Sequence, residues 1–108
     1  FMTMEHLEVE TPVIIERWMM NNWFLYVVEC SDKSFYTGIT TDIHRRIHQH
    51  NNTSKGAKYT RGRRPVQLRF WLDFSNRSEA SKAEAAFKKL SRKEKEFAIS
   101  QRLLTLMK

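Results

Sequence analysis

Apolar and polar positions divide most of the chain into short runs that predict strands and helices. Trp23 to Cys30 is aromatic and β-branched, which is typical of a strand. The turn-forming segment Ser31 to Ser34 separates it from a second such run, Phe35 to Ile39, so the two runs are expected to form a hairpin. Val66 to Asp73 predicts a third strand.

A first helix is expected directly after the hairpin. Its start should lie near Asp42, whose negative charge suits a helix N-terminus, with Thr40 or Thr41 as the N-cap. It should end at about His50. The segment from Asn51 to Pro65 is polar and basic, so it is expected to be a loop.

Two pairs of residues with capping-box spacing predict the later helices. Asn76 and Glu79 predict a helix that runs to Leu90, and Ser91 and Glu94 predict another that continues toward the C-terminus. The expected order is therefore β-β-α-β-α-α, an α/β (α+β) fold without internal repeats.

Length and composition indicate one globular domain. The 108 residues suffice for a single compact core, and 41% of them are hydrophobic. We expect this domain at residues 21–108, preceded by an acidic extension at residues 1–20. No apolar run is long enough for a membrane span, and the first residues lack the order of a secretory signal. A single cysteine, Cys30, excludes a disulfide framework and a cysteine-rich zinc site, so a cytoplasmic setting is expected.

Charge is distributed unevenly along the chain. The formal net charge is +7, but residues 1–20 contain four glutamates and one arginine, so the remainder carries +10. No acidic residue occurs between Asp42 and Asp73. A long segment with positive charges and no negative ones favours a polyanionic partner such as nucleic acid. The alternative is a basic surface that is only solvated. Its cations are Arg45, Arg46, Lys55, Lys58, Arg61, Arg63, Arg64 and Arg69.

Two polar residues share the apolar face of the first predicted helix. Arg46 and His50 follow Ile43 by three and seven residues, so they lie on the side of Ile43 and Ile47. This side should pack on the sheet, so the two residues either line a site or form buried pairs. A histidine in such a position can also be a hydrogen-bonded packing residue. The side chains expected to point away are those of His44, Arg45 and His48.

Other candidate site residues have ordinary structural alternatives. Tyr26 and Tyr36 lie in adjacent predicted strands and could expose both hydroxyls on one face, although strand tyrosines commonly serve only in packing. Gly38 weakens a strand interior and often marks a close approach to the backbone. Glu84 lies beside the apolar stripe of its helix, where it could reach a cleft or pair with Lys88 at i+4.

Taken together, these residues resemble the pattern of the GIY-YIG nuclease superfamily. Phe24-Leu25-Tyr26 and Tyr36-Thr37-Gly38 stand where the family has its two signature tripeptides, with the tyrosines ten positions apart. Arg46 to His50 is similar to its Arg-x-x-x-His, and Glu84 to its metal-binding glutamate. The similarity extends from Trp23 to Ile99. Phe24 and Thr37 depart from the signature glycine and isoleucine, and a late asparagine of some homing-type members has no clear match.

The resemblance implies both a fold and a mechanism. The fold is the GIY-YIG fold, a three-stranded, mostly antiparallel sheet flanked by helices. The catalytic residues would be Tyr26, Tyr36, Arg46 and His50, and Glu84 would hold one Mg²⁺ or Mn²⁺ ion. Arg46 would stabilise charge on the reacting phosphate, and either Tyr26 or Tyr36 would orient or deprotonate the attacking water. Which tyrosine does so remains open at this point.

The resemblance also implies the substrate class. The chain is similar to the small proteins that consist of little more than this module, and its segment Lys55 to Pro65 resembles a loop of the Slx-type structure-specific endonucleases. We therefore expect an endonuclease acting on DNA, with branched or damaged DNA in repair or recombination as its setting. Alternatives are a non-catalytic nucleic-acid-binding module of the same fold and an adaptor with a protein partner in a repair complex. The residues expected to contact nucleic acid are Gly38, Lys55, Lys58, Tyr59, Arg61, Arg63 and Arg64.

Overall fold

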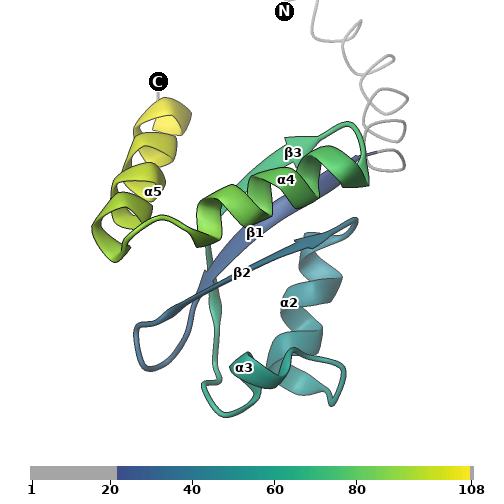
Figure 1. The fold of residues 1–108 in the computed structure, drawn as a ribbon. Coiled ribbons are helices and arrows are strands. Elements are labelled where there is room, and N and C mark those ends of the chain that lie inside the picture. The colour runs from purple at the N-terminus through teal and green to yellow at the C-terminus, as the bar shows by residue number, and fades with distance from the viewer. Residues whose placement is uncertain (1–21, 108) are drawn as a thin grey trace, which may run out of the picture.

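The computed structural model describes residues 22–107 and contains one three-stranded antiparallel sheet with helices on both faces (Figure 1). The strand order is β2-β1-β3, so β1 is central. The elements along the chain are β1 (Trp23–Glu29), β2 (Phe35–Thr40), α2 (Ile43–Asn52), α3 (Lys58–Arg61), β3 (Gln67–Phe74), α4 (Arg77–Lys88) and α5 (Arg92–Met107). The expected fold class is confirmed. The short helix α3 is an addition, because it lies in the segment that the sequence predicted to be a loop.

The central strand β1 is buried on both of its faces. Leu25 and Val27 face a core that contains Phe70, Phe87 of α4 and Ile99 of α5. The alternate positions face a second core on the side of α2 and α3, as strand geometry requires. That second core contains Tyr26, Val28, Cys30 and Val66, with Tyr36 and Ile47 packed against it. The α2 side of the sheet therefore buries the first signature tyrosine.

Helix caps agree with the sequence at two of three positions. The Glu79 backbone N–H donates to Asn76 Oδ1 over 2.9 Å, which confirms that cap. The expected cap of α2 is wrong, because Asp42 itself is the N-cap and accepts from the Arg45 N–H over 3.0 Å. The hydroxyl of Thr40 instead accepts from the Asp42 backbone N–H.

The second capping box is complete. The Ser91 N–H donates to Glu94 Oε1 over 2.8 Å, and the Glu94 N–H donates to Ser91 Oγ over 3.2 Å. This reciprocal pair separates α4 from α5. Across residues 22–107, no helix is both long enough and apolar enough to cross a membrane. The extension expected at residues 1–20 lies outside the described residues.

Candidate active site

The hydroxyl of Tyr26 is the centre of a buried polar cluster between β1 and α2. Its oxygen lies 2.8 Å from His50 Nε2 and accepts a hydrogen bond from Arg46 Nε over 3.3 Å. Tyr26 is 1% exposed and His50 is 0% exposed. The inward orientation predicted for Arg46 and His50 is therefore confirmed, because both side chains reach from α2 to the sheet.

His50 is held at both ring nitrogens. Opposite its contact with Tyr26, Nδ1 lies 2.8 Å from the Thr60 hydroxyl and 3.4 Å from the Ala57 backbone nitrogen. Thr60 is itself fully buried, and its hydroxyl lies 3.0 Å from the Ala57 carbonyl oxygen. A neutral imidazole has one N–H, so one ring nitrogen donates and the other accepts within this chain. The ring therefore connects β1 to α3.

Arg46 is fixed by three hydrogen bonds that leave part of its guanidinium free. Besides the bond from Nε to Tyr26, Nη1 donates to Gln49 Oε1 over 3.0 Å and to the Lys55 carbonyl over 2.9 Å. Among residues 22–102, whose side chains the structure describes, Nη2 has no hydrogen-bond acceptor. Since arginine binds phosphate through paired N–H groups, Nη2 is the part of Arg46 that remains available to an anion.

Burial keeps both members of the Tyr26–His50 pair neutral. Desolvation raises the pKa of Tyr26 to about 12, and the hydrogen bond and charge of Arg46 offset only part of that rise. Burial, together with the charges of Arg46 and Arg64, lowers the pKa of His50 to about 4. At neutral pH Tyr26 therefore keeps its proton and His50 carries no charge.

Tyr36 lies on the same face of the sheet as Tyr26. Tyr36 pairs with Val28 and Gly38 pairs with Tyr26 across the β1–β2 ladder, so both tyrosines face α2. Their ring centroids are 6.4 Å apart, and the Tyr36 ring meets the His50 ring edge-on at 5.3 Å. Within the described part of the chain, the Tyr36 hydroxyl makes no hydrogen bond. The two tyrosines thus share a location but differ in what their hydroxyls can do.

The space beside Gly38 belongs to Tyr26. A Cβ at position 38 would lie 2.6 Å from the Tyr26 hydroxyl oxygen. The sequence correctly predicted a close approach at Gly38. Gly38 was also expected to contact nucleic acid. That expectation is corrected, because Gly38 is buried and the group beside it is the chain's own Tyr26.

Glu84 lies on α4, which contacts both β1 and β2. Its side chain is 24% exposed, and Oε2 lies 3.3 Å from Lys88 Nζ, so the salt bridge weighed as an alternative is present. Its charge also acts on the site, because Glu84 is among the groups that raise the pKa of Tyr26. This influence is the smallest of those on Tyr26, and α4 packs on the Leu25 and Val27 face of the sheet, opposite the face that carries Tyr26.

Glu84 suits a magnesium ion that takes most of its ligands from water and substrate better than it suits a metal held entirely by protein side chains. Residues 22–107 contain no group of three or more His, Cys, Asp or Glu side chains that could hold a metal. Mg²⁺ commonly binds through one or two carboxylates and takes its other ligands from water and substrate phosphates. One partly exposed carboxylate at Glu84 is compatible with that type of site.

The basic segment between α2 and β3 contains both exposed cations and structural ones. Lys55, Lys58 and Arg61 are exposed, and Arg61 Nη2 donates to the Ser54 carbonyl over 3.3 Å. Arg64 differs from the sequence expectation. Its Nε donates to the His50 carbonyl over 2.6 Å and its Nη2 to the Thr53 carbonyl, so it caps the end of α2. Two of the three guanidinium nitrogens of Arg64 are thus engaged in structure.

Arg63 and Tyr59 form a pair within this segment. The Arg63 guanidinium carbon lies 4.0 Å from the centroid of the Tyr59 ring, and Nη1 donates to the Tyr59 carbonyl over 2.8 Å. Arg63 Nε also donates to Asp32 Oδ2 over 3.0 Å. The Tyr59 ring, 39% exposed, stacks on Tyr36 with centroids 5.9 Å apart.

Thr60 and Gly56 are site residues that sequence reasoning missed. A Cβ at position 56 would lie 2.9 Å from the Cα of His50 and 3.0 Å from the Gln49 carbonyl oxygen. The segment after α2 therefore folds back onto the helix and brings Ala57 and Thr60 to His50. The one available signal was a glycine in a polar segment, which did not indicate what it would contact.

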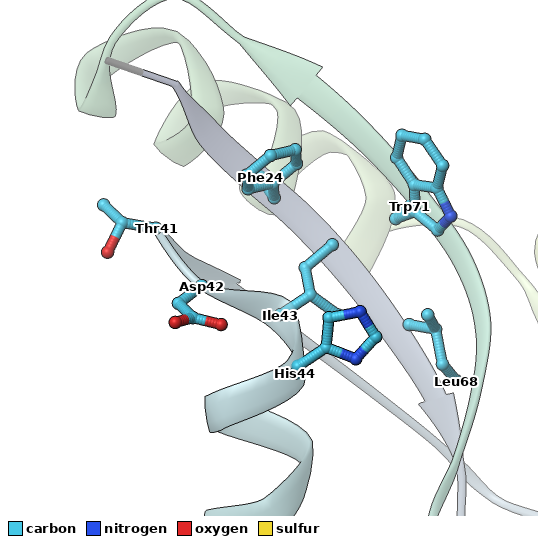
Figure 2. Close-up of a pocket in the computed structure, with 7 residues that line it drawn as sticks. All are labelled: Phe24, Thr41, Asp42, Ile43, His44, Leu68 and Trp71. Carbon is cyan, nitrogen blue, oxygen red and sulfur yellow. The ribbon is translucent and has the colours of Figure 1, made fainter. Parts of the chain in front are cut away.

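An apolar pocket of about 410 Å³ opens on the other flank of α2 (Figure 2). Successive residues of a helix turn by about 100°, so His44 and Arg46 leave α2 on opposite flanks. None of the catalytic candidates lines this pocket. His44 was expected to point away from the sheet, but it lies at the pocket rim with Ile43. The lining residues are Phe24, Thr41, Asp42, Ile43, His44, Leu68 and Trp71.

Comparison with known proteins agrees with the fold. Residues 22–97 match the GIY-YIG catalytic domain. The chain therefore belongs to the GIY-YIG family, a nuclease-type family, and the resemblance seen in the sequence is confirmed.

More particular relatives are small proteins of this family. The UPF0213 protein YazA of Bacillus subtilis (strain 168) is 54% identical over 82 residues, which cover 76% of this chain and 82% of the relative. The UPF0213 protein VNG_2274C of Halobacterium salinarum is 54% identical over 72 residues, covering 67% of this chain and 92% of the relative. The solution NMR structure of the protein EF2693 from E. faecalis matches with a TM-score of 0.52 and 44% identity, covering 76% and 88% of the two chains.

Proposed function

We propose that this chain is a metal-dependent endonuclease that hydrolyses phosphodiester bonds in DNA. The observation that supports this most is the unequal use of polar atoms in the cluster. The Tyr26–His50 pair is buried and hydrogen-bonded, whereas Arg46 Nη2 and the Tyr36 hydroxyl have no hydrogen-bond partner among residues 22–102. Arg46 and Tyr36 are both half-buried, so these two groups are accessible to a ligand at the edge of the buried pair.

The two tyrosines take different roles in this proposal. Tyr26 keeps its proton, since burial raises its pKa to about 12, and its oxygen is held by His50 and Arg46. It therefore orients Arg46. Tyr36 presents a hydroxyl without an internal partner, so it is the group that orients or deprotonates the attacking water. His50 holds Tyr26 in place and does not act on the substrate.

Arg46 binds and stabilises the reacting phosphate. Its Nε and Nη1 bonds fix the plane of the guanidinium, and the free Nη2 can donate to a phosphate oxygen. A donor that is already oriented needs no rearrangement as negative charge develops in the transition state. Charge stabilisation of this kind commonly changes rates by about 10²- to 10³-fold.

Glu84 is the residue that would hold one Mg²⁺ or Mn²⁺ ion. A divalent ion at this position would polarise the phosphate and stabilise the leaving oxygen. The partly exposed carboxylate and the resemblance to the family's metal-binding glutamate support the assignment. Binding the ion would compete with the salt bridge to Lys88.

The basic segment supports a nucleic-acid substrate. Lys55, Lys58 and Arg61 are exposed and lie on the chain between His50 and β3, without an acidic residue in that interval. Cations in such an arrangement bind backbone phosphates without selecting a sequence. We further propose that branched or damaged DNA in the cytoplasm is the substrate.

A cleavage assay on a panel of substrates tests the proposal. Labelled linear, nicked, flapped and branched DNA, and RNA of the same sequence, are incubated with Mg²⁺, Mn²⁺ or chelator. We expect metal-dependent cleavage by the wild type and its loss in Glu84→Gln, with DNA binding retained. Lys88→Ala is the matched control, because it removes the same salt bridge and keeps the carboxylate. Equal losses in both variants would contradict the metal role.

The second candidate is a non-catalytic nucleic-acid-binding module of the same fold. The observation in its favour is the Glu84–Lys88 salt bridge, which gives the carboxylate a structural partner. Binding to DNA by the wild type, with no cleavage of any substrate under any metal condition, would support this candidate over the nuclease.

A further inference from the structure

Tyr59 forms the outer wall of the space that contains the Tyr36 ring. The two rings are stacked, with centroids 5.9 Å apart and an interplanar angle of 22°. The other aromatic neighbours of Tyr36 are Tyr26, at 6.4 Å, and His50, at 5.3 Å. Those two are buried, whereas Tyr59 is 39% exposed. Tyr59 therefore separates the inner aromatic group from solvent.

Arg63 holds Tyr59 in this position. Its guanidinium covers the Tyr59 ring at 4.0 Å and donates to the Tyr59 carbonyl over 2.8 Å. A cation over an aromatic face is attracted by the ring, and the hydrogen bond to the backbone fixes its orientation. Tyr59 is thus restrained through both its ring and its backbone.

Asp32 connects this pair to the hairpin that carries Tyr36. Its Oδ2 accepts from Arg63 Nε over 3.0 Å, and its Oδ1 accepts from the Ser34 backbone N–H over 3.0 Å. The hydrogen bonds from Ser34, and then Arg63, lower the pKa of the Asp32 carboxyl, so it is charged at neutral pH. The β1–β2 turn therefore ties α3 to the start of β2, where Tyr36 lies.

We propose that Tyr59, clamped by Arg63 and Asp32, is a positioning residue that fixes the ring of Tyr36 so that its hydroxyl can act on the attacking water. This inference rests on the proposed nuclease function. A tyrosine whose hydroxyl has no internal hydrogen bond depends on ring packing for its orientation, and the stack with Tyr59 supplies the solvent-facing part of that packing. The competing role for Tyr59, a platform on which a nucleobase stacks, predicts a different kinetic pattern.

The kinetic test separates turnover from binding. Tyr59→Leu is expected to lower kcat by about 10- to 100-fold with KM and the DNA dissociation constant nearly unchanged, since a small misplacement of a reacting group has effects of that size. Tyr59→Phe should restore kcat, because the stacked ring remains. Asp32→Asn should give a smaller decrease in kcat in the same direction. A base-stacking platform would instead show weaker binding in Tyr59→Leu with kcat retained, and that result would overturn the proposal.

A measurement on the free protein keeps the inference separate from the nuclease assignment. The ring proton resonances of Tyr36 are followed by NMR in the wild type, Tyr59→Phe, Tyr59→Leu and Asp32→Asn. We expect a Tyr36–Tyr59 contact and similar Tyr36 shifts in the first two, with a clear shift in Tyr59→Leu. If the wild type cleaves no substrate, the proposed function fails. Unchanged Tyr36 resonances in Tyr59→Leu would overturn the role of Tyr59, whatever the cleavage assay shows. If Tyr59→Leu does not fold, Asp32→Asn decides the outcome, and unchanged Tyr36 shifts together with unchanged kcat in it would overturn the proposal.

Discussion

The hydroxyl of Tyr26 lies where a side chain at Gly38 would begin. An added Cβ would come within 2.6 Å of the hydroxyl oxygen and 2.8 Å of the ring carbon that bears it. Because Gly38 is the direct cross-strand partner of Tyr26, its missing side chain creates the space in which Tyr26 meets Arg46 and His50. A glycine in the interior of β2 is thus required by the geometry of the cluster.

The variant Gly38→Ala should displace the Tyr26 hydroxyl and destabilise the protein. Overpacking a buried site costs about 1–3 kcal/mol, and the hydrogen bonds of Tyr26 would be strained as well. Chemical denaturation measures the free energy of unfolding. Gly62→Ala is the control, because nothing lies within 4 Å of a Cβ there. Similar stabilities of the two variants would show that the contact at Gly38 is relieved without cost.

Tyr26→Phe should destabilise the fold far more than Tyr36→Phe. The first substitution leaves His50 Nε2 and Arg46 Nε without their partner, and an unsatisfied buried polar group costs about 1–3 kcal/mol. The second removes a hydroxyl that makes no hydrogen bond among residues 22–102, so a change within about 0.5 kcal/mol is expected. The cleavage rate should respond differently: Tyr36→Phe should lose most of its activity although its stability is nearly unchanged. Equal losses of stability would argue against the different roles of the two hydroxyls.

Stability should fall as the pH is lowered from about 6.5 toward 4, because of His50. Its pKa is about 4 in the folded protein and near 6.5 when unfolded, so protonation favours the unfolded chain. The stabilisation from the neutral ring is complete above the unfolded pKa and is lost as the pH falls through the folded one. It amounts to at most about 3.5 kcal/mol, since the pKa falls from 6.5 to about 4 and one pKa unit corresponds to ~1.4 kcal/mol.

Urea unfolding at about pH 4 and about pH 7 measures this dependence. His50→Gln should flatten the stability curve in this interval, whereas His44→Gln, at an exposed position on the same helix, should leave it unchanged. A wild-type slope that persists in His50→Gln would assign the pH dependence to other groups.

Exposed cations of the basic segment should contribute to DNA binding through phosphates. Lys58→Ala combined with Arg61→Ala is expected to weaken binding to all sequences and to reduce the slope of log K against log salt by about 2. Binding titrations at several salt concentrations check this. The control is Lys82→Ala with Lys93→Ala, which removes two exposed charges from α4 and α5. A loss confined to one DNA sequence would instead indicate contacts to bases.

Local patterns in the sequence predicted the parts of the site that lie on single elements. Helical spacing placed Arg46 and His50 on the inner face of α2, and strand pairing placed Tyr26 and Tyr36 on one face of the sheet. The capping boxes after β3 were likewise local and are confirmed. These relationships depend on periodicity within about two turns or on one hairpin, so a single sequence contains them.

The contacts that close the site come from the segment between α2 and β3 and have no periodic signal. Thr60 follows His50 by ten residues in the sequence and bonds to its ring. A glycine is needed at position 56 because the backbone of α2 leaves no room there for a side chain. Arg64 was expected to bind phosphates because it belongs to the basic segment. A count of charges cannot show that two of its nitrogens donate to carbonyls at the end of α2. The same limit applies to Glu84, whose spacing to Lys88 was visible but whose electrostatic effect on Tyr26 was not.

The side chain of Asn51 fastens the two ends of the basic segment together. Its Nδ2 donates to the Val66 carbonyl over 3.1 Å, and its Oδ1 accepts from the Val66 N–H over 2.7 Å, as a neighbouring strand would. The 14 intervening residues therefore form a closed loop whose anchor is independent of its outward side chains. Evolution or engineering can exchange the exposed cations Lys55, Lys58 and Arg61 of this loop, and so change which nucleic acids are bound while the sheet and the tyrosine cluster stay intact.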